Sequence, residues 1–115
     1  MSGNFVSNAC RLVGAHLTTT GNTTIFTAVG YVQVIGIRLA NITGANAVAT
    51  VAWFSSGAND QYRILFQHTV PGNGAVWLPL EAFALNESDQ IRVQAGTASA
   101  LDVVLSISEI PGRSG

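Results

Sequence analysis

Several segments of this chain alternate between apolar and polar residues with a period of two, which is the pattern of a strand that buries one face. In residues 101–110 one face is aliphatic throughout, with Leu101, Val103, Leu105 and Ile107. Residues 90–95 repeat the pattern with Ile91, Val93 and Ala95. Turn residues (Gly, Asn, Pro and Ser) separate such segments every ten to fifteen residues or so, a spacing typical of sandwiches and barrels. The pattern therefore predicts an all-β fold.

The alternating segments give eight predicted strands. They lie near residues 9–19, 23–29, 31–43, 47–55, 61–70, 75–80, 90–95 and 101–110. Eight strands fit an antiparallel β-sandwich of two four-stranded sheets. Pro79 lies within the sixth segment and cannot donate a ladder hydrogen bond, so we expect that strand at a sheet edge. The 115 residues form a single predicted domain (1–115), with an N-terminal arm (1–10) and a C-terminal tail (111–115).

One predicted strand, residues 31–43, is apolar on both faces. One face carries Ile35, Ile37 and Leu39, and the other carries Val32, Val34, Ala40 and Ile42. Such a strand is covered on both faces, and a chain this short offers little for a second cover. We therefore expect a neighbouring subunit to supply it. The predicted interface consists of Phe5, Arg11, Val32, Val34, Arg38, Ile42 and Arg113.

Composition also favours a surface that is partly covered in use. Charged residues make up only 10% of the chain and hydrophobic residues 48%, whereas soluble domains carry about 25% charged residues. All five basic residues are arginines, which suit interfaces because arginine loses less than lysine on desolvation. Codon usage in a GC-rich genome explains this bias equally well.

Charge and hydropathy also exclude some partners. The net charge is −1 and the chain has no basic run, so direct binding of nucleic acid is not expected. The N-terminus lacks the charged start and apolar run of a signal peptide, and no stretch reaches transmembrane length. We expect synthesis in a host cytoplasm and no membrane partner.

Candidate chemical groups are few and scattered. Cys10, His16 and His68 lack further ligands at a spacing typical of metal sites, so we predict neither a metal nor a cofactor. Cys10 is the single cysteine and is predicted to be a buried thiol. His68 is predicted to be a hydrogen-bonded residue at the rim of the core. His16 has no carboxylate or serine close by in sequence that would orient a catalytic imidazole.

The acidic residues do not predict catalysis either. A carboxylate pair could come from Glu81, Glu87, Asp89 and Glu109, but a glycosidase also needs a substrate cleft. We interpret these residues as solvated loop acids. The chain contains no nucleophile elbow and no phosphate-binding glycine loop. We therefore predict no catalytic residue and no enzymatic activity.

Three aromatic residues leave a binding function open. Trp53, Tyr62 and Trp77 would form a flat aromatic platform for a sugar if they were exposed on one surface. Core packing is the other explanation for tryptophans in apolar strands.

Three stretches of the second half carry a further pattern. They are residues 71–79, 83–95 and 101–110, and an apolar strand that ends in Leu39-Ala40-Asn41 precedes them. Together, over roughly residues 24–110, they resemble small virion proteins of tailed bacteriophages. In these proteins a Leu-x-x-Gly-Asp turn leads into the penultimate strand, and here Ser88 replaces the glycine before Asp89.

The resemblance implies a jelly-roll-like module of a virion, such as a head decoration or cement protein, commonly trimeric. Its implied partners are further copies of the chain and other virion proteins such as the major capsid protein. We therefore predict a structural virion protein, most specifically a homotrimeric capsid decoration protein, that acts through binding. The alternatives are a neck or tail component and a carbohydrate-binding module.

Overall fold

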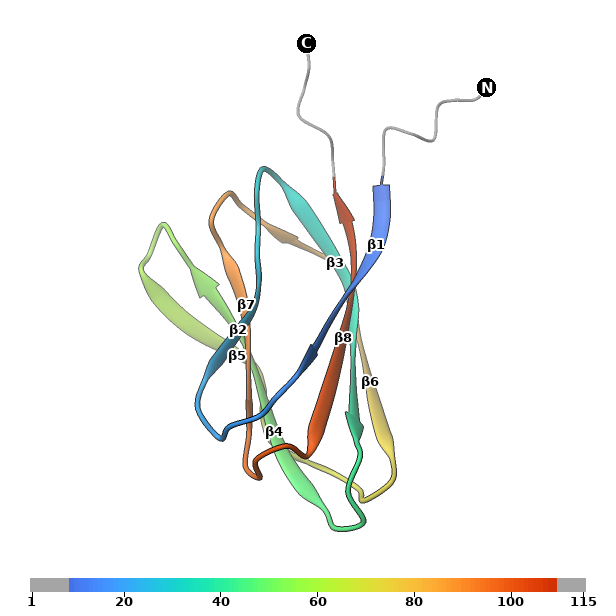
Figure 1. Cartoon of the computed structure of the whole chain (residues 1–115). Coiled ribbons are helices and arrows are strands. Elements are labelled where there is room, and N and C mark those ends of the chain that lie inside the picture. Colours follow the sequence, from blue (N-terminus) through green and yellow to red (C-terminus); the bar gives the residue numbers. More distant parts are fainter. Residues whose placement is uncertain (1–8, 110–115) are drawn as a thin grey trace, which may run out of the picture.

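The structure, a computed structural model, describes residues 9–109 and shows them as eight strands (Figure 1). The strands are β1 (Ala9–His16), β2 (Thr23–Thr27), β3 (Val32–Asn41), β4 (Ala47–Ser55), β5 (Asp60–Val70), β6 (Ala75–Leu85), β7 (Gln90–Ala95) and β8 (Leu101–Glu109). Each lies where the alternation of apolar and polar residues predicts it. β6 continues past the predicted end at residue 80, because it is an edge strand in which Pro79 need not interrupt the ladder.

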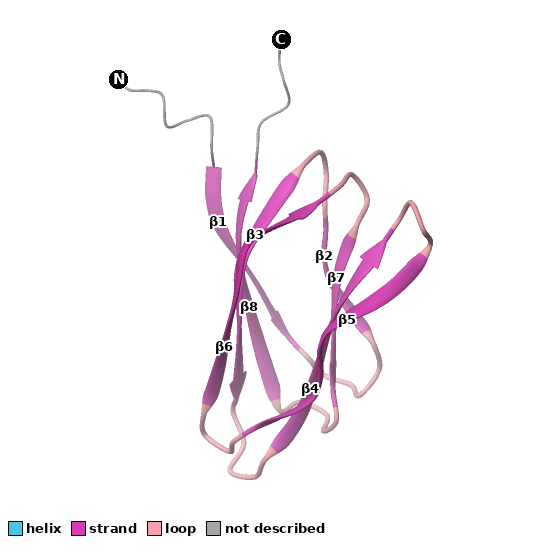
Figure 2. Cartoon of the chain, turned by 180° about the vertical axis from the view of Figure 1, so that it is seen from behind, coloured by secondary structure: helices cyan, strands magenta, loops and turns pink. Residues whose placement is uncertain are grey.

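The strands form two antiparallel four-stranded sheets that pack as two layers (Figure 2). Sheet A has the order β1-β8-β3-β6 and sheet B the order β2-β7-β4-β5. The β4–β5 hairpin joins neighbours within sheet B, and every other connection crosses from one sheet to the other. Eight strands connected in this way form a jelly roll. The predicted antiparallel, jelly-roll-like sandwich is confirmed, and so is the edge position of the strand that holds Pro79.

The core lies between the two sheets and uses one face of each strand. On β8 the inward residues are Leu101, Val103, Leu105 and Ile107, and on β7 they are Ile91, Val93 and Ala95. All are fully buried, as the period-two pattern predicts. Burying one such Leu, Ile or Val side chain stabilises the fold by about 1.5–3 kcal/mol, so these alternating faces are the main source of stability.

Residues 31–43 were predicted to form a strand with two apolar faces, and the structure of β3 differs from this prediction. Its register with β8 shifts between Val34 and Gly36, which leaves Ile35 as an extra residue. The register with β6 shifts at the same point, where residues 80–82 of β6 lie opposite Ile35. This bulge brings Val34 and Ile37 to the same face, although they are three positions apart. Val32 and Val34 are therefore 0% exposed and belong to the core. The argument that this strand needs a second subunit to cover it is wrong, because one inserted residue turns Val32 and Val34 inward together with Ile37 and Leu39.

The loops gather at the two ends of the sandwich (Figures 1 and 2). The connections at residues 28–31, 56–59 and 86–89 lie at the end where Ala9 pairs with Glu109. The connections at residues 17–22, 42–46, 71–74 and 96–100 lie at the opposite end. Apart from Ala9 and Cys10, which belong to β1, the predicted arm and tail fall outside the described residues.

Candidate interaction surface

The outer face of sheet A is broad and carries few charges. Its residues alternate with the buried ones, and the strand register places them side by side. They include Leu12, Gly14 and His16 on β1, Asp102, Val104 and Ser106 on β8, Gly36, Arg38 and Ala40 on β3, and Ala75, Trp77 and Pro79 on β6. Arg38 and Asp102 are the only residues of this set that carry a full charge at neutral pH with histidine neutral.

Two large apolar side chains on this face are open to solvent. Leu12 is 68% exposed and Trp77 is 47% exposed. The Trp77 ring lies against the backbone of Gly36, where a Cβ atom would overlap the ring. Glycine at this position therefore lets the indole pack onto its own sheet. A nearly uncharged sheet face with exposed Leu and Trp side chains has the character of the central part of a protein interface.

The strand register brings together a histidine and a carboxylate that are far apart in the sequence. His16 Nδ1 lies 2.5 Å from Asp102 Oδ1, and both side chains are partly exposed. The expectation that no carboxylate orients His16 is therefore wrong, because β1 pairs with β8. Among residues 9–109, Asp102 is the one hydrogen-bond partner of the His16 side chain.

A second pair joins the same two strands at the other end of β1. Arg11 donates from Nε to Glu109 Oε1 at 3.0 Å and from Nη2 to Oε2 at 3.1 Å. The hydrogen bond from Arg11 holds the pKa of Glu109 below its ordinary value, against a smaller opposing effect of partial burial. The predicted interface residue Arg11 therefore forms its carboxylate fork within its own chain.

The interpretation of the acidic residues as solvated loop acids is wrong for Asp89. It is 1% exposed, and its carboxylate accepts four hydrogen bonds. Oδ1 accepts from Ser56 N at 3.0 Å and Ser56 Oγ at 3.0 Å, and Oδ2 from Trp53 Nε1 at 3.1 Å and Asn86 N at 3.0 Å. Burial alone would raise the pKa of Asp89, but these hydrogen bonds outweigh burial and hold it below its ordinary value. Asp89 thus ties the β4–β5 and β6–β7 connections together.

Cys10 also differs from its prediction, since the thiol is exposed and not buried. Cys10 lies on β1, at the edge of sheet A, opposite Ser108 of β8. Alternation along a strand predicts which residues share a face, but it does not show which strand lies at an edge.

The three candidate aromatic rings do not form one platform. Trp53 packs against Tyr62 at a centroid distance of 5.3 Å and edge-on against Phe83 at 5.8 Å, and its Nε1 donates to Asp89. Trp53 and Tyr62 belong to sheet B, whereas Trp77 lies on the outer face of sheet A. Trp53 therefore has a packing role, and a sugar platform built from all three rings is ruled out.

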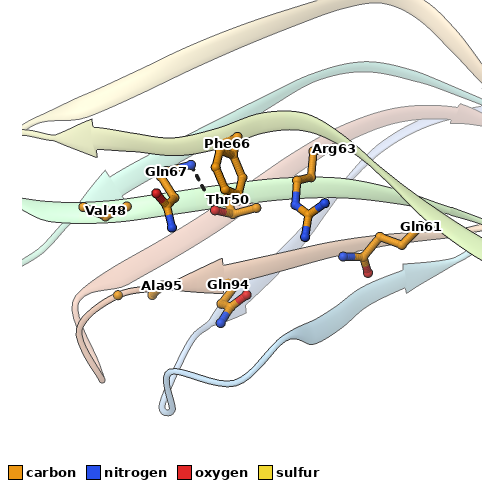
Figure 3. A pocket seen from close by; sticks show the side chains of 9 residues that line it. Val48, Thr50, Gln61, Arg63, Phe66, Gln67, Gln94 and Ala95 are labelled. Carbon is orange, nitrogen blue, oxygen red and sulfur yellow. Dashed lines mark hydrogen bonds between the residues drawn. The ribbon is translucent and has the colours of Figure 1, made fainter.

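The outer face of sheet B carries polar and charged side chains as well as the exposed Val48 and Phe66, and it is hollowed into a shallow pocket of about 330 Å³ (Figure 3). The pocket is lined by residues such as Thr50, Gln61, Arg63, Phe66 and Gln94, and none of its lining residues is acidic. The Arg63 guanidinium lies 5.1 Å from the centre of the Phe66 ring. This pocket was not predicted, because β5 bulges beside it and the bulge leaves no mark in the alternation.

Polar groups on the outer face of sheet B bond mainly to one another. Gln61 Oε1 accepts from Asn22 Nδ2 at 2.9 Å and from Arg92 Nη1 at 3.3 Å, and the Arg92 guanidinium lies 4.1 Å from the centre of the Phe54 ring. A face whose donors and acceptors are satisfied internally suits contact with solvent. In the described part of the chain there is no cluster of three or more metal-ligating side chains, and no helix long and apolar enough to cross a membrane.

Comparison with known proteins supports the fold but assigns no family. No protein-family model matches the chain, and no curated protein sequence matches it. A chain in the structure of infectious bursal disease virus Gx strain has a similar fold. It superposes with a TM-score of 0.53 at 7% identity, over 93% of this chain and 33% of that one. A chain in the crystal structure of the T13 IBDV viral particle gives a TM-score of 0.49 at 8% identity, over 92% and 32%. This chain thus spans about a third of the length of each viral chain.

The predicted interface residues do not form one patch. Val32 and Val34 are buried in the core, so their assignment to an interface is wrong. Arg38 is exposed on the outer face of sheet A, and Ile42 is exposed in the connection that follows β3. Arg11 lies near the opposite end of the sandwich. Phe5 and Arg113 lie outside the described residues.

Proposed function

We propose that this chain is a structural protein of a virus particle, and specifically a capsid decoration protein of a tailed bacteriophage. The observation that supports the proposal is the jelly roll itself. Its fold is shared, over 93% of the chain, with part of a protein found in the structure of infectious bursal disease virus. The proposal includes self-association as a homotrimer, the major capsid protein as a partner and residence in the virion, and it assigns no catalytic step to the chain.

The two outer faces support this function because they differ in character. The outer face of sheet A presents Leu12 and Trp77 among mostly small and uncharged residues, with Arg38 and Asp102 as its two charged residues. Apolar area removed from water on such a face contributes about 25 cal/mol per Å². The outer face of sheet B carries polar and charged side chains that bond to one another, together with the exposed apolar side chains of Val48 and Phe66. A sandwich with one face suited to protein contact and the other to solvent fits a protein that coats a shell.

The direct test is to purify virus particles from the source of the gene and quantify peptides of this chain by mass spectrometry. We expect a copy number comparable with that of the major capsid protein, and immunogold labelling on the head. An abundant cytoplasmic protein of the host serves as the measure of contamination. Absence of the chain from the particles would contradict a virion function, and label confined to the tail would contradict decoration of the head.

A matched pair of variants tests which face binds the shell. Trp77→Glu places a charge on the outer face of sheet A, and Gln94→Glu places the same charge on the exposed outer face of sheet B. We expect Trp77→Glu to abolish co-sedimentation with shells that lack the protein, and Gln94→Glu to bind like the wild type. Circular dichroism should show that both variants remain folded. Equal binding by the two variants would exclude sheet A as the contact face.

A further inference from the structure

The two sheets have four edge strands in the described part of the chain, and three of them are interrupted. β6 contains Pro79 and a register shift against β3. β2 has 5 residues and a register shift at Ile25. β5 has two register shifts against β4, and its Gln67 has a φ of 49°. Proline, bulges and shortness are the devices by which natural sheets prevent pairing with another strand.

The fourth edge, β1, has none of these devices. All eight of its residues pair in sequence with β8, without a register shift. It contains neither proline nor lysine. Its arginine bonds to Glu109 and its histidine to Asp102, and both of these partners belong to β8, the inner neighbour of β1. The outer edge of β1 therefore presents a regular row of backbone N–H and C=O groups, and both of its basic side chains are bonded to β8.

We propose that the free edge of β1 binds β1 of a second copy, antiparallel and around a two-fold axis centred on Leu12. The pairing joins two copies of sheet A into one eight-stranded sheet. A two-fold axis perpendicular to the sheet keeps the outer faces of both copies on the same side of the joined sheet. Residues that lie opposite each other across the axis therefore point to the same side. Leu12, which is 68% exposed in the middle of the strand, then lies opposite Leu12 of the second copy.

This register also fits the other residues of β1. With Leu12 on the axis, Cys10 faces Gly14 of the second copy and Arg11 faces Val13. No like charges meet, and the small residues at positions 14 and 15 leave room for close approach of the strands. A self-complementary edge of this kind selects a second copy of the chain as its partner. The contact does not depend on the proposed virion function, and it is separate from three-fold association.

Disulfide trapping tests the geometry directly in the full chain. In a Cys10→Ser background, Leu12→Cys places two thiols directly opposite each other, with Cβ atoms about 4.5–5.5 Å apart. We expect oxidised glutathione to convert this variant rapidly to a covalent dimer of twice the 12.0 kDa chain mass. Ala84→Cys in the same background is the control, because Ala84 is exposed on the opposite edge strand, β6. Equal trapping of both variants, or no trapping of Leu12→Cys, would overturn the proposal.

Sedimentation equilibrium tests the energetics with a second matched pair. Leu12→Lys brings two ammonium groups face to face across the axis, and like charges directly opposite destabilise a strand pair. We expect the dissociation constant of the β1 contact to rise by about tenfold or more, equivalent to about 1.4 kcal/mol. Ile35→Lys adds the same charge to sheet A on the interior strand β3, and we expect it to leave the constant unchanged.

The outcomes separate this contact from the proposed function. A trimer that Leu12→Lys leaves intact would overturn β1 pairing and leave the virion proposal standing. A wild-type protein that stays monomeric would overturn both β1 pairing and the proposed trimer, whereas the presence of the chain in virus particles is tested separately. If the chain forms dimers through β1 but is absent from virus particles, β1 pairing stands and the virion proposal is contradicted. Equal dissociation by Leu12→Lys and Ile35→Lys would assign association to the face of sheet A and not to its edge.

Discussion

Replacing Asp89 by asparagine tests whether one buried carboxylate holds the turn end of the sandwich together. Each carboxylate oxygen of Asp89 accepts two hydrogen bonds, from Ser56 at Oδ1 and from Trp53 and Asn86 at Oδ2. An asparagine side chain keeps one oxygen and replaces the other by an NH₂ group, which donates and cannot accept. With the NH₂ group at the Oδ2 position, the bonds from Trp53 Nε1 and Asn86 N are lost. With the NH₂ group at the Oδ1 position, the bond from Ser56 N is lost, whereas Ser56 Oγ can accept from the amide and still donate to Glu87 O. Either orientation therefore loses at least one hydrogen bond and places an N–H donor against the NH₂ group.

The expected loss is large because the group is buried and charged. Hydrogen bonds to charged groups contribute about 1.5–3 kcal/mol each, so losing one or two lowers the free energy of unfolding by about 1.5 kcal/mol or more. Domains of this kind have a total stability of about 5–15 kcal/mol. In urea, where the slope is about 1–3 kcal/mol per molar, we expect the unfolding midpoint of Asp89→Asn to fall by about 0.5 M or more.

The control is the same substitution at an exposed aspartate. Asp60 is exposed, and among the described residues its carboxylate accepts only from the N–H of Gln61. Asp60→Asn should change the free energy of unfolding by less than about 0.5 kcal/mol. If Asp89→Asn and Asp60→Asn unfolded at the same urea concentration, the account of Asp89 as a structural acceptor would be refuted.

Titration gives an independent check on Asp89. Because its pKa is lowered in the folded state, its contribution is complete above the unfolded pKa of about 3.9 and is lost as the pH falls through the lower folded value. The stability difference between wild type and Asp89→Asn should therefore narrow below about pH 4. The pKa of Glu109 is also lowered, by Arg11, so protonation of Glu109 destabilises the fold over a similar pH range. Both proteins contain Glu109, so its effect cancels in the stability difference between them. A difference that stays constant down to about pH 2 would contradict the assignment.

Four further substitutions have clear expected results. Ser88 adopts a φ of 72°, a conformation that costs non-glycine residues about 1–2 kcal/mol. Ser88→Gly should therefore raise the free energy of unfolding, measured in urea, by about 1 kcal/mol. A lowered unfolding midpoint would contradict this prediction. Leu105→Ala should cost about 2–5 kcal/mol because Leu105 is fully buried, whereas Leu12→Ala should leave the unfolding of the monomer within about 0.5 kcal/mol of wild type. Gly36→Ala should displace the Trp77 ring from the sheet, which the indole N–H resonance would report; an unshifted resonance would show that the ring does not rest there.

Alternation along the chain was enough to locate the strands because most of them bury one face, although in β5 only Val70 is buried. The buried positions of β7 and β8 are the ones that a period of two selects. The same rule fails in β3, where the extra residue at Ile35 changes the phase of the pattern midway. A bulge leaves the composition of a segment unchanged, so the sequence predicted two apolar faces where the structure has one.

The order of the strands and the contacts between distant residues lie beyond such patterns. The partners in the pair His16 and Asp102 are 86 positions apart, and Asp89 meets Ser56 across 33 positions. Both contacts depend on which strands and turns become neighbours. Likewise, the prediction of a buried Cys10 failed because alternation does not distinguish an edge strand from an interior one. The jelly-roll arrangement was expected from a resemblance, not from periodicity.

The free edge of β1 and the outer face of sheet A belong to one continuous surface, and this continuity makes their proposed roles compatible. Pairing two copies through β1 uses backbone groups at the edge and leaves Trp77, three strands away on β6, uncovered. The joined sheet would then present two copies of the same weakly charged face on one side. A contact of this kind enlarges the apolar area available to a shell without adding charge, and binding two sites at once strengthens attachment beyond that of either copy. The polar outer faces of sheet B would remain on the opposite side, toward solvent.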